Sequence, residues 1–524
     1  MKQTSSIPAA AFLLATGILL SRILGYVREV LLAYKFGANG VTDAFYAAFQ
    51  IPDLLNYFLS GGALSIAFIP LYNKVLVRDG EEAARALTAA VLGTLGAVVT
   101  AATAILWWQA PALIRFQFPH FADDTTELTV HLTRIVLPAQ IFFITGGIVQ
   151  AVLLARRNFM AAALSPLIYN ALIIAGGYFL EPFVGIDGFA IGTLAGSFFG
   201  PFLLPVIYAW REKPLRMRFA PSDKHFLIYI VLAAPLMFGQ TLLTLDEWYG
   251  RWFGGLLSAG TVAHLSYARK LMQVPIAVIG QAVAAAALPT LSKLWSEDRV
   301  EELNATLTQT LRTGISLAVL AGAGLFAVSG PLVTLVYQQG AFGEEDARTV
   351  SILVTIFAFA MPGWVMQQIS ARAFYARGDT WRPMVLGTVL SLLAIPMYFW
   401  FSDLMGVGGL ALAGVVGMTV NAAATVVFAR KLHGAPPLMP LLYSIGRSVG
   451  IAIPSAMVAA NAIVARWAYY PVKNTKLAAL ADAAAGGLGF SVVAVCGILL
   501  FGDPPLRHFM MRIFRLREPG RTII

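Results

Sequence analysis

Cysteine and charge are both scarce in this chain, and their scarcity narrows the possible classes of protein. Cys496 is the only cysteine, which excludes intrachain disulfides and any metal site built on several cysteines. Because it lies in an apolar run, it is expected to be a small buried hydrophobe. Charged residues make up 12% and hydrophobic residues 58% of the 524 positions. A single soluble core does not grow this large while staying this apolar, so the sequence predicts an integral membrane protein.

The chain also lacks the short motifs that mark many enzymes. It has no G-x-x-x-x-G-K-[ST] phosphate loop, no H-E-x-x-H, no G-x-S-x-G and no Cys/His ligand cluster. Enzymatic activity is therefore not expected, and neither is ATP-driven pumping by this chain alone. An integral-membrane transferase acting on polyprenyl phosphates is the alternative from another class. It would need carboxylates with a metal, typically in Asp-rich loops, and these are missing.

Hydropathy predicts an all-α fold with fourteen membrane-spanning segments. Their approximate limits are 8–34, 43–73, 86–110, 128–155, 160–180, 186–210, 225–256, 261–291, 307–337, 348–376, 383–402, 407–430, 440–467 and 477–501. The connections alternate between basic ones, such as that with Arg156 and Arg157, and acidic or neutral ones, such as FADDTTE and GAFGEED. By the positive-inside rule, both termini are expected in the cytoplasm, as an even number of spans requires. The net charge of +10 thus indicates membrane orientation rather than binding to nucleic acid.

A faint internal repeat runs through the sequence. FGANGVTDAFYAAFQIPDLL has a later counterpart in FGGLLSAGTVAHLSYARKLMQVP, roughly 220 residues on, as expected of parallel repeats around a central pathway. Chance similarity between two apolar helices is the alternative.

Charged residues inside the predicted spans need an explanation, because inserting each one at bilayer depth costs at least about 2.5–3.5 kcal/mol of free energy. In the first span the polar residues share one face, an arc of roughly 120° at 100° per residue. They are Ser21, Arg22, Arg28 and Glu29, with Gly25 between them. The second span carries Asp43, Gln50 and Asp53 on one stripe beside Pro52. An Arg–Glu pair that only ties the first span to a neighbour is the structural alternative.

The seventh and eighth spans carry a further concentration of charges. Glu247 and Arg251 are spaced for a structural i,i+4 pair. Arg269 and Lys270 lie in the eighth span, near Pro275. Together with Arg22 and Arg28 they would form a cationic cavity, which suits an anionic headgroup, and phosphate above all.

The chain resembles the MurJ/MviN family of lipid II flippases, within the multidrug/oligosaccharidyl-lipid/polysaccharide exporter superfamily. The resemblance covers nearly the whole chain and is carried by SRILGYVRE, FGANGVTDAFYAAFQIPDLL, GGALSIAFIP, YARKLMQVP and ALPTLS. It implies two six-helix lobes around a central cavity and an added C-terminal helix pair lining a groove for the lipid tail. The implied activity moves undecaprenyl-pyrophosphate-linked peptidoglycan precursor (lipid II) from the inner to the outer leaflet of the bacterial cytoplasmic (inner) membrane.

The resemblance also bears on single residues. Arg22, Arg28, Glu29 and Asp43 match the family pattern, and Lys270 stands where the family often has a cavity arginine. Asp246 matches an acid linked to sodium binding in some members, but its usual Asn and Asp partners are missing from SLLAIPMYFWF. Sodium coupling through Asp246 is therefore left open, and no other cofactor is expected.

These observations predict the domains, the substrate-binding residues and the partners of the protein. Residues 1–218 form the N-terminal lobe, 219–434 the second lobe, 435–503 the C-terminal helix pair and 504–524 a basic cytoplasmic tail. The expected substrate-binding cavity residues are Arg22, Arg28, Glu29, Lys270, Arg269, Asp43, Asp53, Gln50 and Ser21. Expected partners are lipid II or a related polyprenyl-pyrophosphate glycan, membrane lipids and cell-wall synthesis proteins, with no nucleic acid. The alternative function is a flippase for another polyprenyl-linked oligosaccharide, or a multidrug exporter. An exporter of cationic drugs, however, would need acidic residues to bind its substrate, and the predicted cavity has a surplus of basic ones.

Overall fold

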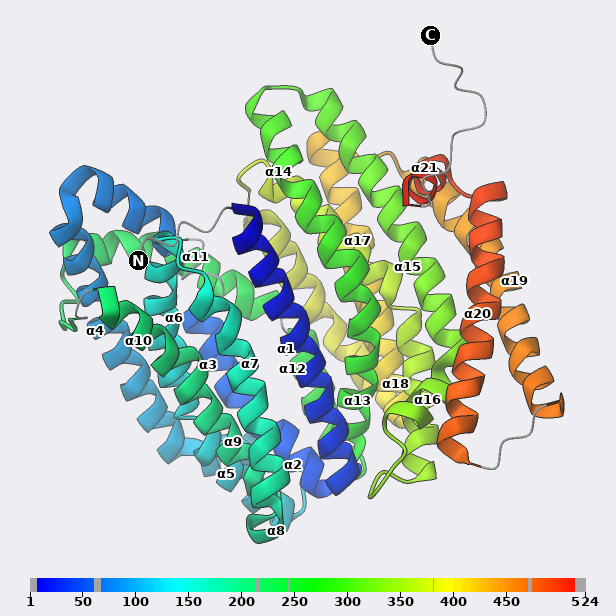
Figure 1. The fold of residues 1–524 in the computed structure, drawn as a ribbon, viewed down its shortest axis with the longest axis horizontal. Helices are drawn as coiled ribbons and strands as arrows, with labels where there is room; N and C mark the ends of the chain where they lie inside the picture. Colours follow the sequence, from blue (N-terminus) through cyan, green and yellow to red (C-terminus); the bar gives the residue numbers. More distant parts are fainter. Residues whose placement is uncertain are drawn as a thin grey trace. The chain divides into compact units, whose positions relative to one another are not determined.

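The computed structural model describes residues 7–60, 67–212, 216–243, 245–379, 381–469 and 474–513. Within these ranges every regular element is a helix, as Figure 1 shows. The chain divides into two compact units, Met1–Ala263 and His264–Ile524. The predicted all-α fold is confirmed.

The first unit begins with α1, the helix that carries the charged face. Its helices are α1 (Ile7–Phe36), α2 (Gly40–Ala48), α3 (Gln50–Ser60), α4 (Ile69–Gln117), α5 (Asp123–Val136), α6 (Ala139–Ala155), α7 (Met160–Ala175), α8 (Glu181–Val184), α9 (Asp187–Ser197), α10 (Leu204–Glu212), α11 (Lys224–Leu243) and α12 (Leu245–Gly254). Two π-helical segments, η2 (Gly176–Leu180) and η3 (Phe198–Leu203), continue α7 and α9.

The second unit starts within α13 (Thr261–Ile276), which continues through the π-helical segment η4 (Ala277–Gln281) into α14 (Ala282–Ser296). The later helices are α15 (Val300–Val336), α16 (Glu344–Ala358), α17 (Met361–Tyr375), α18 (Trp381–His433), α19 (Leu438–Tyr469), α20 (Thr475–Phe501) and α21 (Pro504–Ile513). The C-terminal pair α19 and α20 packs on α15, as Figure 1 shows.

The helices have the length and composition of membrane spans. In the described ranges, eight helical stretches are long and apolar enough to cross a bilayer, or nine if the bent pair α16–α17 is one span. Two long helices are broken by glycines with positive φ, α4 at Gly80 (φ 87°) and α18 at Gly406 (φ 56°). The break in α18 separates the predicted spans 383–402 and 407–430. The chain is thus a multi-pass membrane protein, and the count of fourteen crossings stays a prediction.

The backbone carries the predicted internal repeat with a constant offset. Helix α5 begins at Asp123 and α16 at Glu344, while α7 begins at Met160 and α18 at Trp381; each pair lies 221 positions apart (344 − 123 and 381 − 160). Gly185 and Gly406 keep the same spacing and share a left-handed conformation (φ 61° and 56°). Agreement in helix starts and in a special backbone conformation is not expected from chance similarity of apolar sequences.

The compact units do not divide where the predicted lobes do. Helix α11, expected to open the second lobe after residue 218, packs against α3 and α4. Its Phe226 and Tyr229 join a buried cluster with Phe68 and Tyr72, and the rings of Phe68 and Tyr229 lie 6.0 Å apart edge to face. Burial of these large aromatic side chains groups α11 with the first unit. The lobe boundaries remain predictions.

One smaller expectation needs correction. Cys496 was expected to be buried but is exposed on α20, as an apolar side chain can be where the surrounding solvent is lipid. The predicted basic tail, residues 504–524, begins with helix α21, whose Leu506 is fully buried in a cluster with Ile451 and Ile498.

Pro52 explains the break between α2 and α3. Proline has no N–H to donate to the carbonyl of Ala48 four residues earlier, so that carbonyl needs another partner. Thr133 of α5 supplies one, donating from its buried hydroxyl to the Ala48 oxygen at 3.4 Å. A hydroxyl from a neighbouring helix is the usual way to satisfy a freed backbone group inside a membrane protein.

A glycine ladder lets α7 and α9 approach closely. Glycines recur every fourth residue along α9 and η3, at Gly188, Gly192, Gly196 and Gly200. A Cβ atom on Gly192 or Gly196 would lie 2.6 Å from the carbonyl oxygen of Leu172 or 2.7 Å from that of Tyr169. Such small-residue stripes allow the close backbone packing that drives helix association in lipid.

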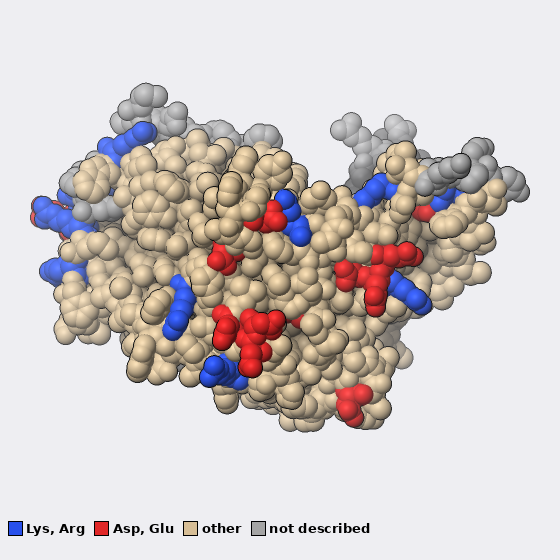
Figure 2. All heavy atoms as spheres, turned by 90° about the horizontal axis from the view of Figure 1, so that it is seen from below, with Lys and Arg blue, Asp and Glu red and all other residues tan. Residues whose placement is uncertain are grey.

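Charge differs between the two ends of the helices. Acidic residues stand in the first turn of α5 in the first unit (Asp123, Asp124) and in the first turn of α16 in the second unit (Glu344, Glu345 and Asp346). Figure 2 shows both acidic and basic side chains on the face seen from below. The stretch from α5 to α6 spans 33 residues, about 50 Å at 1.5 Å per residue. Arg156, which follows it, therefore lies at the opposite end, in agreement with the predicted alternation of loops.

Gly196→Leu tests the glycine ladder. Its side chain would meet the α7 backbone, and overpacking of this kind costs about 1–3 kcal/mol or more. We expect a clear loss of folded protein in membranes, measured by fluorescence-detected size-exclusion chromatography. Gly446→Leu is the matched control, because a Cβ at Gly446 meets nothing within 4 Å. Equal amounts of both variants would contradict the packing account.

Candidate functional site

The charged face of α1 contains an ion pair buried inside the first unit. Arg28 donates from Nη2 to Glu29 Oε1 at 2.7 Å, and the hydroxyl of Tyr46 in α2 donates to Glu29 Oε2 at 2.6 Å. The Glu29 side chain is only 4% exposed, whereas that of Arg28 is 23% exposed. Glu29 is thus a buried counter-ion, held by charge-assisted hydrogen bonds to both of its oxygens. The predicted contact of Glu29 with substrate is not supported by this placement.

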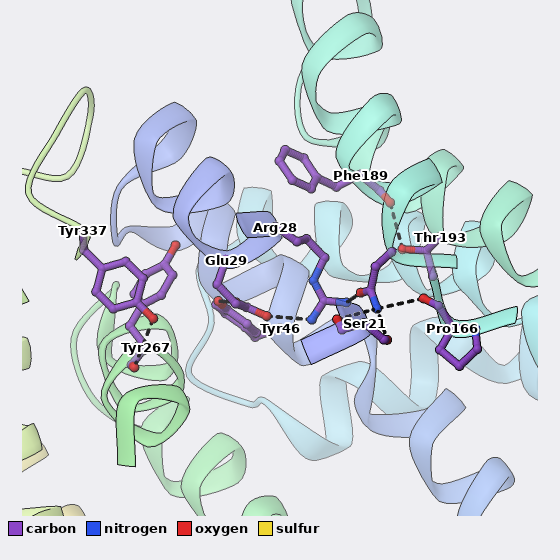
Figure 3. Close-up of polar contacts among 10 residues, drawn as sticks. Ser21, Arg28, Glu29, Tyr46, Pro166, Phe189, Thr193, Tyr267 and Tyr337 are labelled. Atoms are coloured by element: carbon purple, nitrogen blue, oxygen red, sulfur yellow. Dashed lines mark hydrogen bonds and ion pairs between the residues drawn. The ribbon is translucent and has the colours of Figure 1, made fainter. Parts of the chain in front are cut away.

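Asn170 of α7 completes the network around Arg28, in which Figure 3 shows Ser21, Arg28, Glu29 and Tyr46. Its Oδ1 accepts from Arg28 Nη1 at 3.4 Å, a long contact. Its Nδ2 donates to the hydroxyl of Ser21 at 3.1 Å and to the carbonyl of Pro166 at 3.0 Å. Gly25 makes room for this amide, since a Cβ there would lie 3.9 Å from Asn170 Oδ1. The amide thus links the Arg28 guanidinium to the half-buried Ser21 on the same face of α1.

Sequence reasoning missed Asn170, although a signal was present. The residue is a lone amide in the apolar run SPLIYNALIIAG. A buried amide in such a run must find hydrogen-bond partners, and the nearest polar face in the predicted bundle was that of the first span.

Asp43 was assigned to the substrate cavity, but the structure places it inside the protein at the start of α13. It is 1% exposed, and its two oxygens accept from the backbone N–H groups of Gly260 (2.6 Å) and Ala263 (2.8 Å). These N–H groups are the unpaired donors at the start of α13, so Asp43 caps that helix from a distant part of the sequence.

Asp53 and Gln50 lie in different surroundings, and a contact of Asp53 with the substrate stays a prediction. Arg251 of α12 donates from Nη1 to Asp53 Oδ2 at 2.9 Å. This tertiary pair replaces the predicted contact between Glu247 and Arg251. Gln50 is 4% exposed, and its amide oxygen has no hydrogen-bond partner in the described part of the chain. A buried side chain of this kind does not line an open surface.

The remaining predicted cations lie on two different helices. Arg22 is exposed on α1, six residues before Arg28. Arg269 and Lys270 are half-buried on α13, and the Arg269 guanidinium lies 5.8 Å from the ring centre of Phe357. Arg22 belongs to the first compact unit, whereas Arg269 and Lys270 belong to the second. A cavity that these cations share with Arg28 therefore stays a prediction.

No cluster of three or more His, Cys, Asp or Glu side chains that could hold a metal ion occurs in the described ranges. The Nε2 atom of His264 in α13 lies 2.8 Å from Asp346 Oδ1. Asp246 belongs to α12, but its side chain falls outside the described residues. The predicted sodium ligand is therefore untested.

The fold defines a class: a multi-pass helical membrane protein that is similar in fold to solved structures of the MOP superfamily. A solved structure described as "Lipid II flippase MurJ, inward closed conformation" superimposes with a TM-score of 0.77, at 22% identity over 93% of this chain and 99% of the other. An inward-facing MATE family multidrug transporter of the MOP superfamily gives 0.69, at 14% identity over 81% of this chain and 98% of the other.

Sequence comparison identifies the family within that class. The family described as "Lipid II flippase MurJ" matches residues 32–477, and the chain belongs to that family. A probable lipid II flippase MurJ from Rhizobium meliloti (strain 1021) is 27% identical over 91% of this chain and 89% of its own length. The lipid II flippase MurJ of Burkholderia cenocepacia is 28% identical over 79% and 82%.

Substitutions of Asp43 test its capping role. Asp43→Ala removes both acceptors and should lower the free energy of unfolding by about 0.5–2 kcal/mol, visible as a lower melting temperature of the purified protein. Asp43→Asn keeps one acceptor and should lose less. Glu127→Ala, an exposed acid in α5, is the matched control. Wild-type stability with lost transport in Asp43→Asn would instead favour contact with the substrate.

Proposed function

We propose that this protein is a non-enzymatic flippase that moves lipid II from the cytoplasmic to the periplasmic leaflet for cell-wall synthesis. The observation that carries the proposal is the family match over residues 32–477. It is supported by a guanidinium held in position inside an apolar helix, at Arg28. Intramembrane charges commonly mark a substrate path.

In the proposed mechanism, Arg28 binds the pyrophosphate of the lipid. The contacts to Glu29 and Asn170 use one N–H on each terminal nitrogen of Arg28, and a guanidinium carries five N–H donors. The donors left over can bind phosphate oxygens while Glu29 and Asn170 keep the group oriented. Glu29, Asn170 and Ser21 are thus positioning residues and not substrate contacts.

The pair with Glu29 neutralises much of the Arg28 charge, so Arg28 alone gives weak long-range attraction. Arg22, Arg269 and Lys270 supply the surplus positive charge in the proposal. No covalent step is needed. The sugar–peptide headgroup would cross a polar cavity by alternating access, the prenyl tail would stay in lipid, and the membrane potential supplies about 2.3 kcal/mol per charge per 100 mV. Sodium binding at Asp246 would couple lipid transport to a sodium gradient, but the proposed mechanism does not depend on it.

A second function of the same class is a flippase for another polyprenyl-linked oligosaccharide. A multidrug exporter is less favoured, because the similarity to MATE transporters, at 14% identity, concerns the fold alone.

Depletion of the protein in its host tests the function. We expect lipid II to accumulate in the cytoplasmic leaflet and to fall again when the wild-type protein is re-expressed, measured by the access of an externally added lipid II-cleaving toxin. Normal access of the toxin in depleted cells would contradict the proposal. Accumulation of a different polyprenyl-linked glycan would favour the second function.

The proposed location is the inner membrane with both termini in the cytoplasm. Single cysteines introduced into a Cys496→Ser background test it, at exposed positions on the two predicted sides. Cysteines at Asp123 and Glu344 should react with an impermeant thiol reagent in cells with a permeabilised outer membrane, while cysteines at Arg157 and Arg430 should not. The reverse pattern would overturn the orientation.

A further inference from the structure

A cavity of about 720 Å³ lies in the first unit, at the end of the helices that carries Arg156. Arginines from three parts of the chain line it: Arg85 of α4, Arg156 after α6, and Arg216 and Arg218 before α11. Glu82 is the only acidic residue among the described residues that line it. None of the residues predicted for the substrate cavity is among them, so this cavity is separate from the site proposed above.

Arg156 is fixed at the cavity wall by two neighbours. Its Nε donates to the hydroxyl of Tyr72 at 2.9 Å, and its Nη2 donates to Glu81 Oε1. Tyr72 is 1% exposed, so the guanidinium is attached to the packed interior of the unit. The pair with Glu81, which is not a lining residue, offsets the Arg156 charge. Arg156 therefore shapes the wall more than it attracts an anion.

The segment before α11 is fastened along α4. The backbone N–H of Arg218 donates to the carbonyl of Ala89 at 2.9 Å. A Cβ on Gly93 would lie 2.4 Å from the carbonyl oxygen of Arg218, so a glycine is needed for the segment to lie this close to the helix. The Arg218 side chain pairs with Asp223, Nη2 to Oδ2, at 2.7 Å. These contacts place the neighbouring Arg216 in the cavity wall.

Arg85 and Arg216 supply the positive charge that is not offset by an ion pair. Neither guanidinium is ion-paired with any residue in the described ranges. Arg85 is half-buried and Arg216 is exposed, and the one lining acid, Glu82, is exposed as well. Because the planar fork of an arginine binds two oxygens of a phosphate at once, a phosphate group is the anion that this wall fits best.

The second unit is built differently at the corresponding place. At the repeat offset of 221 positions, Arg156 corresponds to Arg377, but residues 216–218 correspond to residues 437–439, which are the uncharged Pro-Leu-Met. Leu441, just after them, joins a buried apolar cluster on α15 and α17. A preference for basic residues on one side of the membrane acts on both units alike. It therefore does not account for arginines that surround a cavity in the first unit.

Exposed aromatic side chains flank the cavity. Trp210 and Phe219 are 62% and 67% exposed, and they are next in sequence to the lining residues Ala209 and Arg218. Aromatic and basic side chains together are typical of the membrane–water interface. The cavity therefore lies at the level of the lipid headgroups, where it is within reach of lipid phosphates and of soluble ones.

We propose that this cavity binds the phosphate group of an anionic ligand, with Arg85 and Arg216 as its direct contacts and Arg156 and Arg218 as fixed walls. Its volume lies in the range of about 300–1,000 Å³ that is usual for small-molecule sites. The phosphate belongs to the headgroup of an anionic phospholipid or to a soluble phosphate, two sources with the same chemistry. The inference does not rest on the proposed function.

The test uses the purified full-length chain in an uncharged detergent, carrying Cys496→Ser and Ala86→Cys. Ala86 is an exposed lining residue, so the alkylation rate of the introduced thiol reports on this cavity alone. Phosphatidylglycerol, phosphatidylcholine and inorganic pyrophosphate are titrated separately. We expect phosphatidylglycerol or pyrophosphate to slow alkylation, and phosphatidylcholine, whose headgroup is neutral overall, to have no effect. The control is Val77→Cys, 89% exposed on α4 and outside the cavity, whose alkylation rate should not change.

Substitution of the two direct contacts tests their role in the same Ala86→Cys background. Arg85→Gln with Arg216→Gln should raise the ligand concentration that gives half-protection about ten- to a hundredfold. The matched control is Lys74→Gln with Arg78→Gln, two exposed basic residues outside the cavity, which should leave that concentration unchanged.

A charge reversal keeps the test decisive if the double variant fails to fold. Arg216 is exposed and lies outside the helices, so Arg216→Glu should fold normally and abolish protection. Arg78→Glu, an exposed reversal outside the cavity, should keep it.

The outcome identifies the source of the phosphate. Protection by phosphatidylglycerol assigns the site to a lipid headgroup, and protection by pyrophosphate alone assigns it to a soluble phosphate. Three results would overturn the proposal: no protection by either ligand, equal protection by phosphatidylcholine, and wild-type protection in the arginine variants.

Discussion

The cost of placing charge in an apolar helix governs the arrangement around α1. An isolated arginine at bilayer depth is unfavourable by several kcal/mol, and the structure offsets this with three groups from three helices. Glu29 supplies the countercharge, Tyr46 supplies a donor to Glu29, and Asn170 supplies an acceptor to Arg28. Removing any one of them leaves a buried polar group short of a partner. The network therefore ties α1, α2 and α7 together and at the same time holds a guanidinium in a fixed orientation.

The ligand interpretation of Arg28 and the structural alternative are thus not exclusive. The predicted alternative, an Arg–Glu pair that ties the first span to a neighbour, is present in the structure through Tyr46 and Asn170. What separates the two interpretations is the difference in exposure, since Glu29 is closed off and Arg28 is not. A pair that served only packing would gain nothing from leaving its cation partly open.

Sequence patterns predicted the fold class and the repeat well, because both depend on periodic features that each helix carries by itself. Hydropathy predicted the helices, and the two matching segments predicted an offset of roughly 220 residues, close to the spacing of Gly185 and Gly406 in the structure. The site was predicted less well. Asp43, Gln50 and Asp53 lie on a polar stripe, but a stripe does not say whether its partner is a ligand or a backbone. Asp43 caps α13, more than two hundred residues away, and no local pattern could indicate that contact. Asn170 did leave a local signal, a lone amide in an apolar run, but that run does not say which helix supplies its partner.

The central claim is that Arg28 binds the transported lipid and does more than neutralise Glu29. Arg28→Ala leaves a buried carboxylate without its cation, so lower membrane abundance is expected under either interpretation. The deciding measurement compares Arg28→Ala with the double variant Arg28→Ala, Glu29→Gln, for membrane abundance and for lipid II translocation in the depleted host. The account predicts that the double variant recovers abundance, because no buried charge is left unpaired, but does not recover translocation. Recovery of both would show that Arg28 serves only the structure.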